Sequence, residues 1–177
     1  FGGGTLYFDT ESSFSPSRLV EIARERYPNI YNTQALKRLI SNVHVYQTNK
    51  TQELVKKLEG LDAFLIEEKI KLIILDSIAL PFRSEFDGKH IPARQRLLNT
   101  VASKLKYFSD TFGLPVVTTN QVTTKFSKAE YGAALGITWA HAVNVRYRLN
   151  CYDSPTNDTA VRREWIIEKS PCSPSMV

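Results

Sequence analysis

A run of four large aliphatic residues that ends in an aspartate, Leu72 to Asp76, constrains the fold of this chain more than any other feature. The run is apolar on both faces, which is typical of a central strand covered by helices on each side. Its carboxylate then stands at the carboxyl end of the strand, where open α/β sheets bind their ligands. The run therefore predicts a helix-flanked parallel sheet with a polar site at one edge.

Strand and helix patterns alternate on both sides of this run. Strands are predicted over residues 5–9, 43–46 and 114–120, which are short, apolar and bounded by polar or turn residues. Helices are predicted from Ser15 and Pro16 up to Pro28, from Gln34 to Ile40, from an Asn49 cap through Leu54, Leu58, Leu61 and Leu65, and from Leu97 to Gly113. This alternation predicts right-handed crossovers and a mainly parallel, twisted sheet.

The last third of the chain changes pattern. Val143, Val145, Tyr147 and Leu149 alternate with polar residues, and residues 165–167 form their neighbour across a turn at 153–158. This indicates an antiparallel hairpin at one edge of the sheet. The predicted fold class is thus α/β, a twisted and mainly parallel sheet flanked by helices, with a late antiparallel hairpin.

Charge and cysteine content narrow the class of protein further. Lys and Arg total 23 against 18 Asp and Glu, so a polyanionic partner is compatible with the net charge of +5 but not required by it. Cys151 and Cys172 belong to no metal-binding pattern, which predicts a reducing compartment and no structural zinc. No apolar run approaches the roughly 20 residues of a membrane span, so no membrane partner is expected.

Polar residues follow three of the predicted strands. They are Asp9-Thr10-Glu11, Asp76-Ser77 and Asn120-Gln121. Asp76 fits a Walker B strand, whose carboxylate reaches Mg²⁺ directly or through water. The alternative is that Asp76 only starts a turn, as aspartates at strand ends often do.

Glu11 and Gln121 are the candidate catalytic residues. Glu11 would polarise the water that attacks a γ-phosphate, and Gln121 would sense that phosphate or its water. The alternatives are an acid at a helix N-terminus for Glu11 and an ordinary loop amide for Gln121.

The phosphate loop GxxxxGK[ST] does not occur in the chain. Neither Gly2-Gly3-Gly4 nor Gly88-Lys89-His90 replaces it, so either the loop lies before Phe1 or the chain is not an ATPase. Both ends read as cut. The expectation is that residues 1–177 are a partial ATPase core without its Walker A region and any N-terminal domain.

Several blocks occur together in an order that resembles the RecA/RadA recombinase superfamily, specifically its eukaryotic paralogue branch and most closely the B type. The similarity spans almost the whole chain. The blocks are residues 7–15 with 18–20, 72–77, 82–87, 93–95, 119–122, 134–141 and 169–171.

The resemblance implies a RecA-like fold that binds ATP and Mg²⁺ between subunits. It implies Asp76 as the magnesium residue with Ser77 beside it, Glu11 as the water-activating base and Gln121 as the nucleotide sensor. Lys169 would reach a neighbouring subunit's nucleotide, or is an edge-strand lysine that opposes aggregation. His141 would couple DNA to nucleotide or be structural, and Trp139 is expected in the core.

The resemblance also implies two loops that contact DNA. The first covers about residues 86–96 with Lys89, Arg94 and Arg96, and the second covers residues 122–136 with Lys125, Lys128 and Tyr131. On composition alone, the alternative is that both are basic loops exposed to solvent. The second loop is short beside that of strand-exchanging members, which argues against autonomous strand exchange.

The implied function is a nuclear DNA repair protein of homologous recombination and double-strand break repair. It would bind ATP and single-stranded DNA, work in a hetero-oligomer with other paralogues and assist a recombinase filament. DNA-dependent ATP hydrolysis is implied for the full-length protein but is left open. The alternatives are a non-catalytic adaptor subunit of a paralogue complex and another RecA-fold ATPase such as a helicase.

Overall fold

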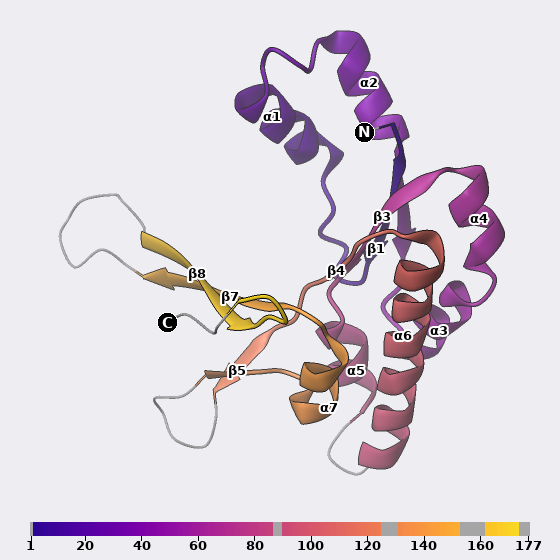
Figure 1. The fold of residues 1–177 in the computed structure, drawn as a ribbon, viewed down its shortest axis with the longest axis vertical. Helices are drawn as coiled ribbons and strands as arrows, with labels where there is room; N and C mark the ends of the chain where they lie inside the picture. Colours follow the sequence, from indigo (N-terminus) through magenta and orange to yellow (C-terminus); the bar gives the residue numbers. More distant parts are fainter. Residues whose placement is uncertain (1, 87–89, 125–130, 153–161, 174–177) are drawn as a thin grey trace.

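The computed structural model describes residues 2–86, 90–124, 131–152 and 162–173 (Figure 1). Its centre is a sheet of four parallel strands: β1 (Gly4–Asp9), β2 (Val43–Gln47), β3 (Ile70–Asp76) and β4 (Val116–Thr118). The strand order is β2-β1-β3-β4. The predicted parallel sheet is therefore confirmed, with the Leu72 to Asp76 run as an inner strand.

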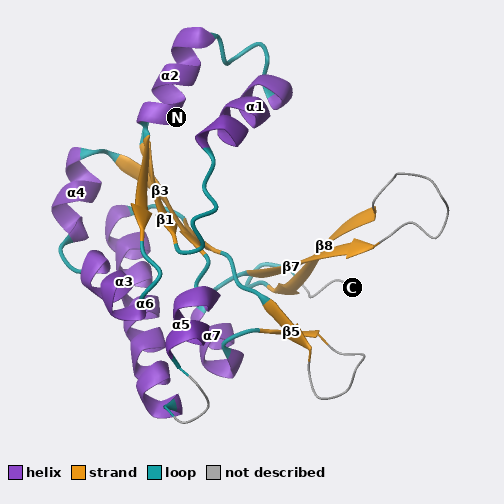
Figure 2. Ribbon diagram, turned by 180° about the vertical axis from the view of Figure 1, so that it is seen from behind, coloured by secondary structure: helices purple, strands orange, loops and turns teal. Residues whose placement is uncertain are grey.

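The core lies along β1 and β3. Leu6 and Phe8 of β1 and Ile73 and Leu75 of β3 are fully buried, as the apolar runs require. Helices α3 (Thr51–Leu58), α4 (Leu61–Glu67) and α6 (Ile91–Phe112) lie together on one side of the sheet in Figures 1 and 2. They add Leu54, Leu58, Leu61, Leu65, Leu98, Val101, Leu105 and Phe108 to the same core.

Helix α1 (Pro16–Arg26) and helix α2 (Thr33–Ser41) form a pair beyond the amino end of β1 (Figure 2). The predicted start of α1 is confirmed, because the Ser15 side chain accepts a hydrogen bond from the Arg18 N–H and Pro16 is the first helical residue. Gly113, with φ of 60°, ends α6 as predicted.

The prediction of one long helix after Asn49 is wrong. Helix α3 begins at Thr51, with Lys50 at its N-cap, and the chain breaks before α4 begins at Leu61. Gly60 takes a positive φ of 75° at the break, a conformation that glycine adopts without steric cost. The leucine stripe misled the prediction because all four leucines remain buried on both sides of the break.

Several short elements lie before α6 and after β4. Helices α5 (Ala79–Glu85) and α7 (Gly136–Ala142) and the hairpin β5 (Val122–Thr124) to β6 (Tyr131–Ala133) were not predicted. The late antiparallel hairpin is confirmed as β7 (Arg146–Tyr152) paired with β8 (Arg162–Lys169). It forms a two-stranded sheet of its own, and both hairpins project away from α3, α4 and α6 (Figure 1). None of the described helices is both long and apolar enough to cross a bilayer.

Candidate functional site

The three polar strand ends meet at one edge of the sheet. Asp9 of β1 lies opposite Asp76 of β3, and the Thr10 N–H donates to the Asp76 carbonyl over 2.8 Å. The Thr119 N–H, just after β4, donates to the Leu75 carbonyl over 3.0 Å. The neighbourhood predicted from the strand ends is therefore present, and we call Tyr7, Asp9, Thr10, Glu11, Asp76, Ser77, Thr119 and Gln121 the strand-end cluster.

Two hydroxyl groups hold the carboxylate of Asp76. The Tyr7 hydroxyl donates to Oδ2 over 2.5 Å, and the Thr119 hydroxyl donates to Oδ1. Tyr7 lies two residues before Asp9 on β1, so both side chains emerge on the same face of the strand. Sequence reasoning missed Tyr7. The alternation of side chains along β1, with its period of two, is the signal that could have identified it.

The phenol of Tyr7 is held in its protonated form. Burial is the main cause that raises its pKa, followed by the hydrogen bond to Asp76 and the negative charges of Asp76, Asp9 and Glu11. The hydroxyl is therefore a hydrogen-bond donor at every physiological pH. Its O–H therefore orients the Asp76 carboxyl group.

Thr10 and Ser77, which directly follow β1 and β3, form two hydrogen bonds with one another. The Ser77 N–H donates to the Thr10 hydroxyl over 2.8 Å, and that hydroxyl donates to the Ser77 carbonyl over 2.8 Å. Both residues are buried. This reciprocal pair joins the end of β1 to the end of β3, and no pattern in the sequence announced it because its members are 67 residues apart.

Glu11 is brought to Ser77 and Gln121. The Ser77 hydroxyl donates to Glu11 Oε1 over 2.6 Å, and the Gln121 amide nitrogen donates to the same oxygen over 3.3 Å. Asp9, not Glu11, binds backbone N–H groups here. Its carboxylate accepts hydrogen bonds from the N–H groups of Ser13 and Phe14, each over 3.1 Å. Glu11 thus stands at the meeting point of three strands rather than at the start of α1.

One further side chain joins this set from α5. The Arg83 guanidinium donates from Nη1 to Gln121 Oε1 over 2.5 Å. Arg83 lies in a block that sequence reasoning singled out without giving it a role. No spacing rule connects it to Gln121, which is 38 residues later in the chain.

The donor set suits a hard, oxygen-preferring cation. Asp76, Ser77, Thr119 and Glu11 offer only carboxylate and hydroxyl oxygens, the ligands that Mg²⁺ prefers. The described residues contain no group of three or more His, Cys, Asp or Glu that would hold a metal by itself. A single carboxylate such as that of Asp76 holds Mg²⁺ when water and ligand oxygens complete the coordination, as is usual for this ion.

Lys169 is held by the end of α7. Its ammonium donates to the carbonyl oxygens of Ala140 and His141, each over 3.2 Å, and to that of Val143. A cation at this position satisfies carbonyls that a helix end leaves unpaired and complements the helix dipole. Its predicted contact with a neighbour's nucleotide stays a prediction, and within this chain the ammonium has a structural role.

The basic residues predicted to contact DNA do not all lie in loops. Arg94 and Arg96 belong to the first turns of α6, which begins at Ile91, so the predicted first loop extends too far. Lys89, Lys125 and Lys128 lie outside the described residues. Tyr131 begins β6, and Trp139 is buried in the core as predicted.

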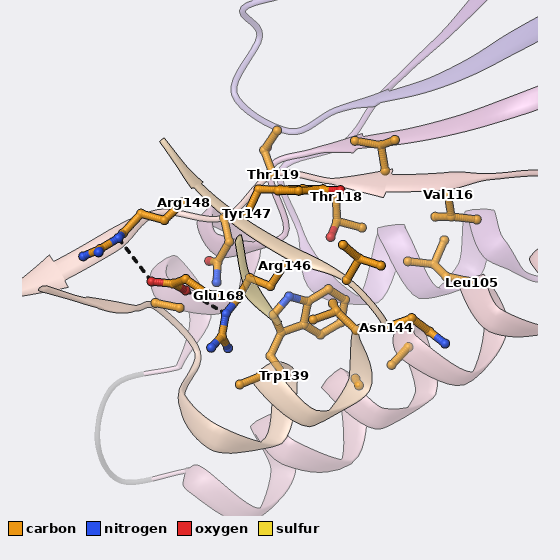
Figure 3. A pocket seen from close by; sticks show the side chains of 18 of the residues that line it. Leu105, Val116, Thr118, Thr119, Trp139, Asn144, Arg146, Tyr147, Arg148 and Glu168 are labelled. Atoms are coloured by element: carbon orange, nitrogen blue, oxygen red, sulfur yellow. Dashed lines mark ion pairs between the residues drawn. The ribbon is translucent and has the colours of Figure 1, made fainter. Parts of the chain in front are cut away.

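A large cavity (Figure 3) adjoins the strand-end cluster, because Thr119 and Gln121 of the cluster are among its lining residues. Its volume is about 1060 Å³, and Leu105, Val116, Trp139, Tyr147 and Trp165 are among its apolar lining residues. Arg146 and Arg148 approach Glu168 at its rim, with N–O distances of 2.8 and 3.2 Å. Within the described residues β4 pairs with β3 only, so no strand covers its other edge. We call this space the β4–β7 cavity, and sequence reasoning did not foresee it.

The family model described as Rad51 matches residues 2–150, so this chain belongs to the Rad51 family. The human DNA repair protein RAD51 homolog 2 is 38% identical over 97% of this chain and 50% of its own length. RAD51 homolog 3 of Cricetulus griseus is 32% identical over 81% of this chain and 44% of its own length.

A more distant relative is the DNA repair and recombination protein RadA of Cenarchaeum symbiosum, 35% identical over 70% of this chain and 30% of its own length. The resemblance to the recombinase superfamily and to its B-type paralogue, RAD51 homolog 2, is thereby confirmed. The chain spans about half the length of the curated relatives it matches.

Proposed function

We propose that this chain is the core of a recombinase paralogue, a DNA repair protein that binds ATP and single-stranded DNA in homologous recombination. The observation that carries the proposal is the convergence of Glu11, Ser77, Asp76 and Gln121 at three adjacent strand ends. Relatives that cover almost all of this chain are named DNA repair proteins. A nuclear location follows from such a role.

The proposed reaction is attack of water on the γ-phosphate of ATP. Glu11 would accept the proton of that water, because its carboxylate is held by Ser77 and Gln121 and lies at the open end of the sheet. Asp76 and Ser77 would hold Mg²⁺, which neutralises phosphate charge when bound. Tyr7 and Thr119 would keep Asp76 oriented, and Gln121 would report the presence of phosphate or water to the chain around it.

The proposed contacts to DNA and partners use the basic residues. Lys89, Arg94, Arg96, Lys125 and Lys128 would neutralise backbone phosphates of single-stranded DNA. Other recombinase paralogues would complete a hetero-oligomer that assists a recombinase filament. Lys169 would reach a neighbour's nucleotide there only after releasing the carbonyls of α7.

A non-catalytic adaptor is the second candidate. The hydroxyls of Tyr7 and Thr119 already bind both oxygens of Asp76, which is how an aspartate in a purely structural role would look. In that case the fold presents an interaction and DNA-binding surface, and ATP turnover is unnecessary.

The first test is to read the coding sequence upstream of Phe1. A GxxxxGK[ST] loop between a strand and a helix there supports ATP binding, because this loop supplies the backbone amides and lysine that hold phosphates. An open reading frame without that loop overturns the ATPase and leaves the adaptor.

The second test is mutational and uses the full-length protein. Glu11→Gln and Asp76→Asn should each abolish ATP turnover and break repair in complemented cells. Glu25→Gln on α1 and Asp110→Asn on α6, both at exposed positions, are the matched controls. Unchanged repair in the first two variants favours the adaptor.

A further inference from the structure

We propose that Arg83 is a positioning residue that orients the Gln121 side-chain amide toward Glu11. The proposal deepens the proposed function, because it rests on the catalytic roles given there to Glu11 and Gln121. Arg83 itself would touch neither the nucleotide nor the attacking water. It would act through one amide, from a helix that follows directly on the Asp76 strand.

The chemistry of the three side chains determines the orientation of the amide. A glutamine has an oxygen that accepts and a nitrogen that donates, and the two ends have nearly the same shape. Arginine has only donors, and an ionised glutamate has only acceptors. With Arg83 at one end and Glu11 at the other, only one of the two amide orientations makes both hydrogen bonds.

The backbones on both sides are fixed, so the freedom that remains lies in the side-chain torsions of Gln121. Helix α5 is anchored by buried Ala79 and Phe82 and by Glu85, whose carboxylate accepts from the Thr51 N–H over 3.1 Å. The Gln121 N–H donates to the Asn120 side chain over 2.9 Å, and the Gln121 carbonyl accepts from Ala134 over 2.8 Å. The terminal torsion of a glutamine is intrinsically broad, so a partner must select its value.

The charges run in a favourable order. The Arg83 cation faces the oxygen of the amide, and the Glu11 anion faces its nitrogen. An amide dipole placed between a cation and an anion in this sense is stabilised by both, and hydrogen bonds to charged groups are stronger than neutral ones. Reversal of the amide would place its oxygen against the carboxylate.

The arrangement also sets the orientation of Glu11. Its Oε1 accepts from Ser77 and from Gln121, while within the described part of the chain Oε2 has no hydrogen-bond partner. Two donors on one oxygen hold the carboxylate in place and leave the other oxygen for water. Loss of Arg83 would let the amide rotate and loosen this hold.

The primary test measures solvent exchange of the Gln121 side-chain amide protons by NMR in the full-length protein. In the wild type these protons should exchange about two- to tenfold more slowly than those of exposed Gln52, the protection expected from one protein hydrogen bond. Arg83→Met should remove the protection and Arg83→Lys, which keeps a donor, should retain part of it. Arg38→Met on α2 is the matched control and should change nothing.

Unprotected Gln121 protons in the wild type overturn the proposal, whether or not any variant folds. So does protection that survives Arg83→Met. Neither outcome depends on ATP turnover, so the proposed function can fail while the role of Arg83 stands.

A second measurement connects Arg83 to the reaction. Arg83→Met should lower kcat for ATP about two- to tenfold with KM unchanged, and Arg83→Lys should restore part of it. In a Gln121→Leu background the same substitution should cost nothing more, because Arg83 acts through that amide. Additive losses in the double variant would show that Arg83 acts elsewhere.

Discussion

The strand-end cluster and the β4–β7 cavity share Thr119 and Gln121, and they are built in opposite ways. In the cluster, polar side chains from β1, β3 and the turn after β4 bind one another over a fully buried layer of Leu6, Phe8, Ile73 and Leu75. In the cavity, large apolar side chains face open space, and Leu149 and Trp165 are 68% and 66% exposed. Thr119 belongs to the cluster and also lines the cavity, where Figure 3 shows it beside Thr118.

The comparison shows that side chains of one sheet can be fully packed beneath the cluster and only partly packed around the cavity. Burial supplies stability only where apolar area leaves water, at roughly 25 cal/mol per Å². The residues beneath the cluster meet this condition, whereas those around the cavity do so only in part. The same type of substitution should therefore lower the free energy of unfolding more in the cluster region than around the cavity.

The largest difference is expected for leucine-to-alanine substitutions. Leu75→Ala, beneath Asp76, should lower the free energy of unfolding by about 2 to 5 kcal/mol, because it leaves a cavity in a packed core. Leu149→Ala in the β4–β7 cavity should cost less than about 1 kcal/mol, because most of that side chain is already in water. Urea unfolding followed by circular dichroism measures both, and equal costs would contradict the contrast.

The next difference is expected for threonine-to-valine substitutions. Thr10→Val removes the hydroxyl that accepts from the Ser77 N–H and donates to its carbonyl, leaving buried groups unpaired at a cost of about 2 to 3 kcal/mol. Thr118→Val in the cavity wall should be nearly neutral, since no hydrogen bond of its side chain occurs within the described residues. Thr10→Ser keeps the hydroxyl and is the control in the same urea experiment.

A smaller, pH-dependent difference is expected for tyrosines. Tyr7→Phe should cost about 1 kcal/mol at pH 7, whereas Tyr147→Phe at the cavity should cost almost nothing. The folded state raises the pKa of Tyr7, so the folded protein keeps a proton that the unfolded chain releases above about pH 10. Wild-type stability should therefore fall as the pH rises past this value, and less so in Tyr7→Phe. Unfolding series between neutral and alkaline pH test this, and parallel curves for the two proteins would refute it.

The smallest effect is expected where β8 meets α7. Lys169→Met removes a cation from three carbonyls at a helix end and should cost about 0.3 to 1 kcal/mol, less at high salt. Lys37→Met on α2 serves as the control at an exposed helix position. Thermal unfolding at two salt concentrations measures the effect, and a loss that salt leaves unchanged would mean that packing, not charge, is responsible.

Local patterns carried most of the fold prediction. Three signals each depend on only a few neighbouring residues, and all three are confirmed: the aliphatic run of β3, the Ser15 and Pro16 start of α1 and the Gly113 end of α6. The break at Gly60 escaped because a regular leucine stripe crosses it. Helices α5 and α7 escaped because each has only seven residues, too few for a clear period.

The candidate site was predictable where residues follow strands. Asp76, Glu11 and Gln121 were found because parallel strands in neighbouring positions bring their carboxyl ends together. Arg83 and Thr119 were missed as site members because they reach it through side chains whose direction depends on packing. The roles of the site residues stay predictions until the proposed substitutions are made.

The sequence by itself determined the alternation of strands and helices, the buried inner strand and the carboxylates at its edge, because these depend on period, burial and turn chemistry within short segments. Only the tertiary structure decided that Tyr7 and Thr119 hold Asp76, that Arg83 meets Gln121 and that Lys169 binds the end of α7. These contacts join residues from 26 to 69 positions apart. Such pairs have no local signal, because their distance is set by how whole strands and helices pack.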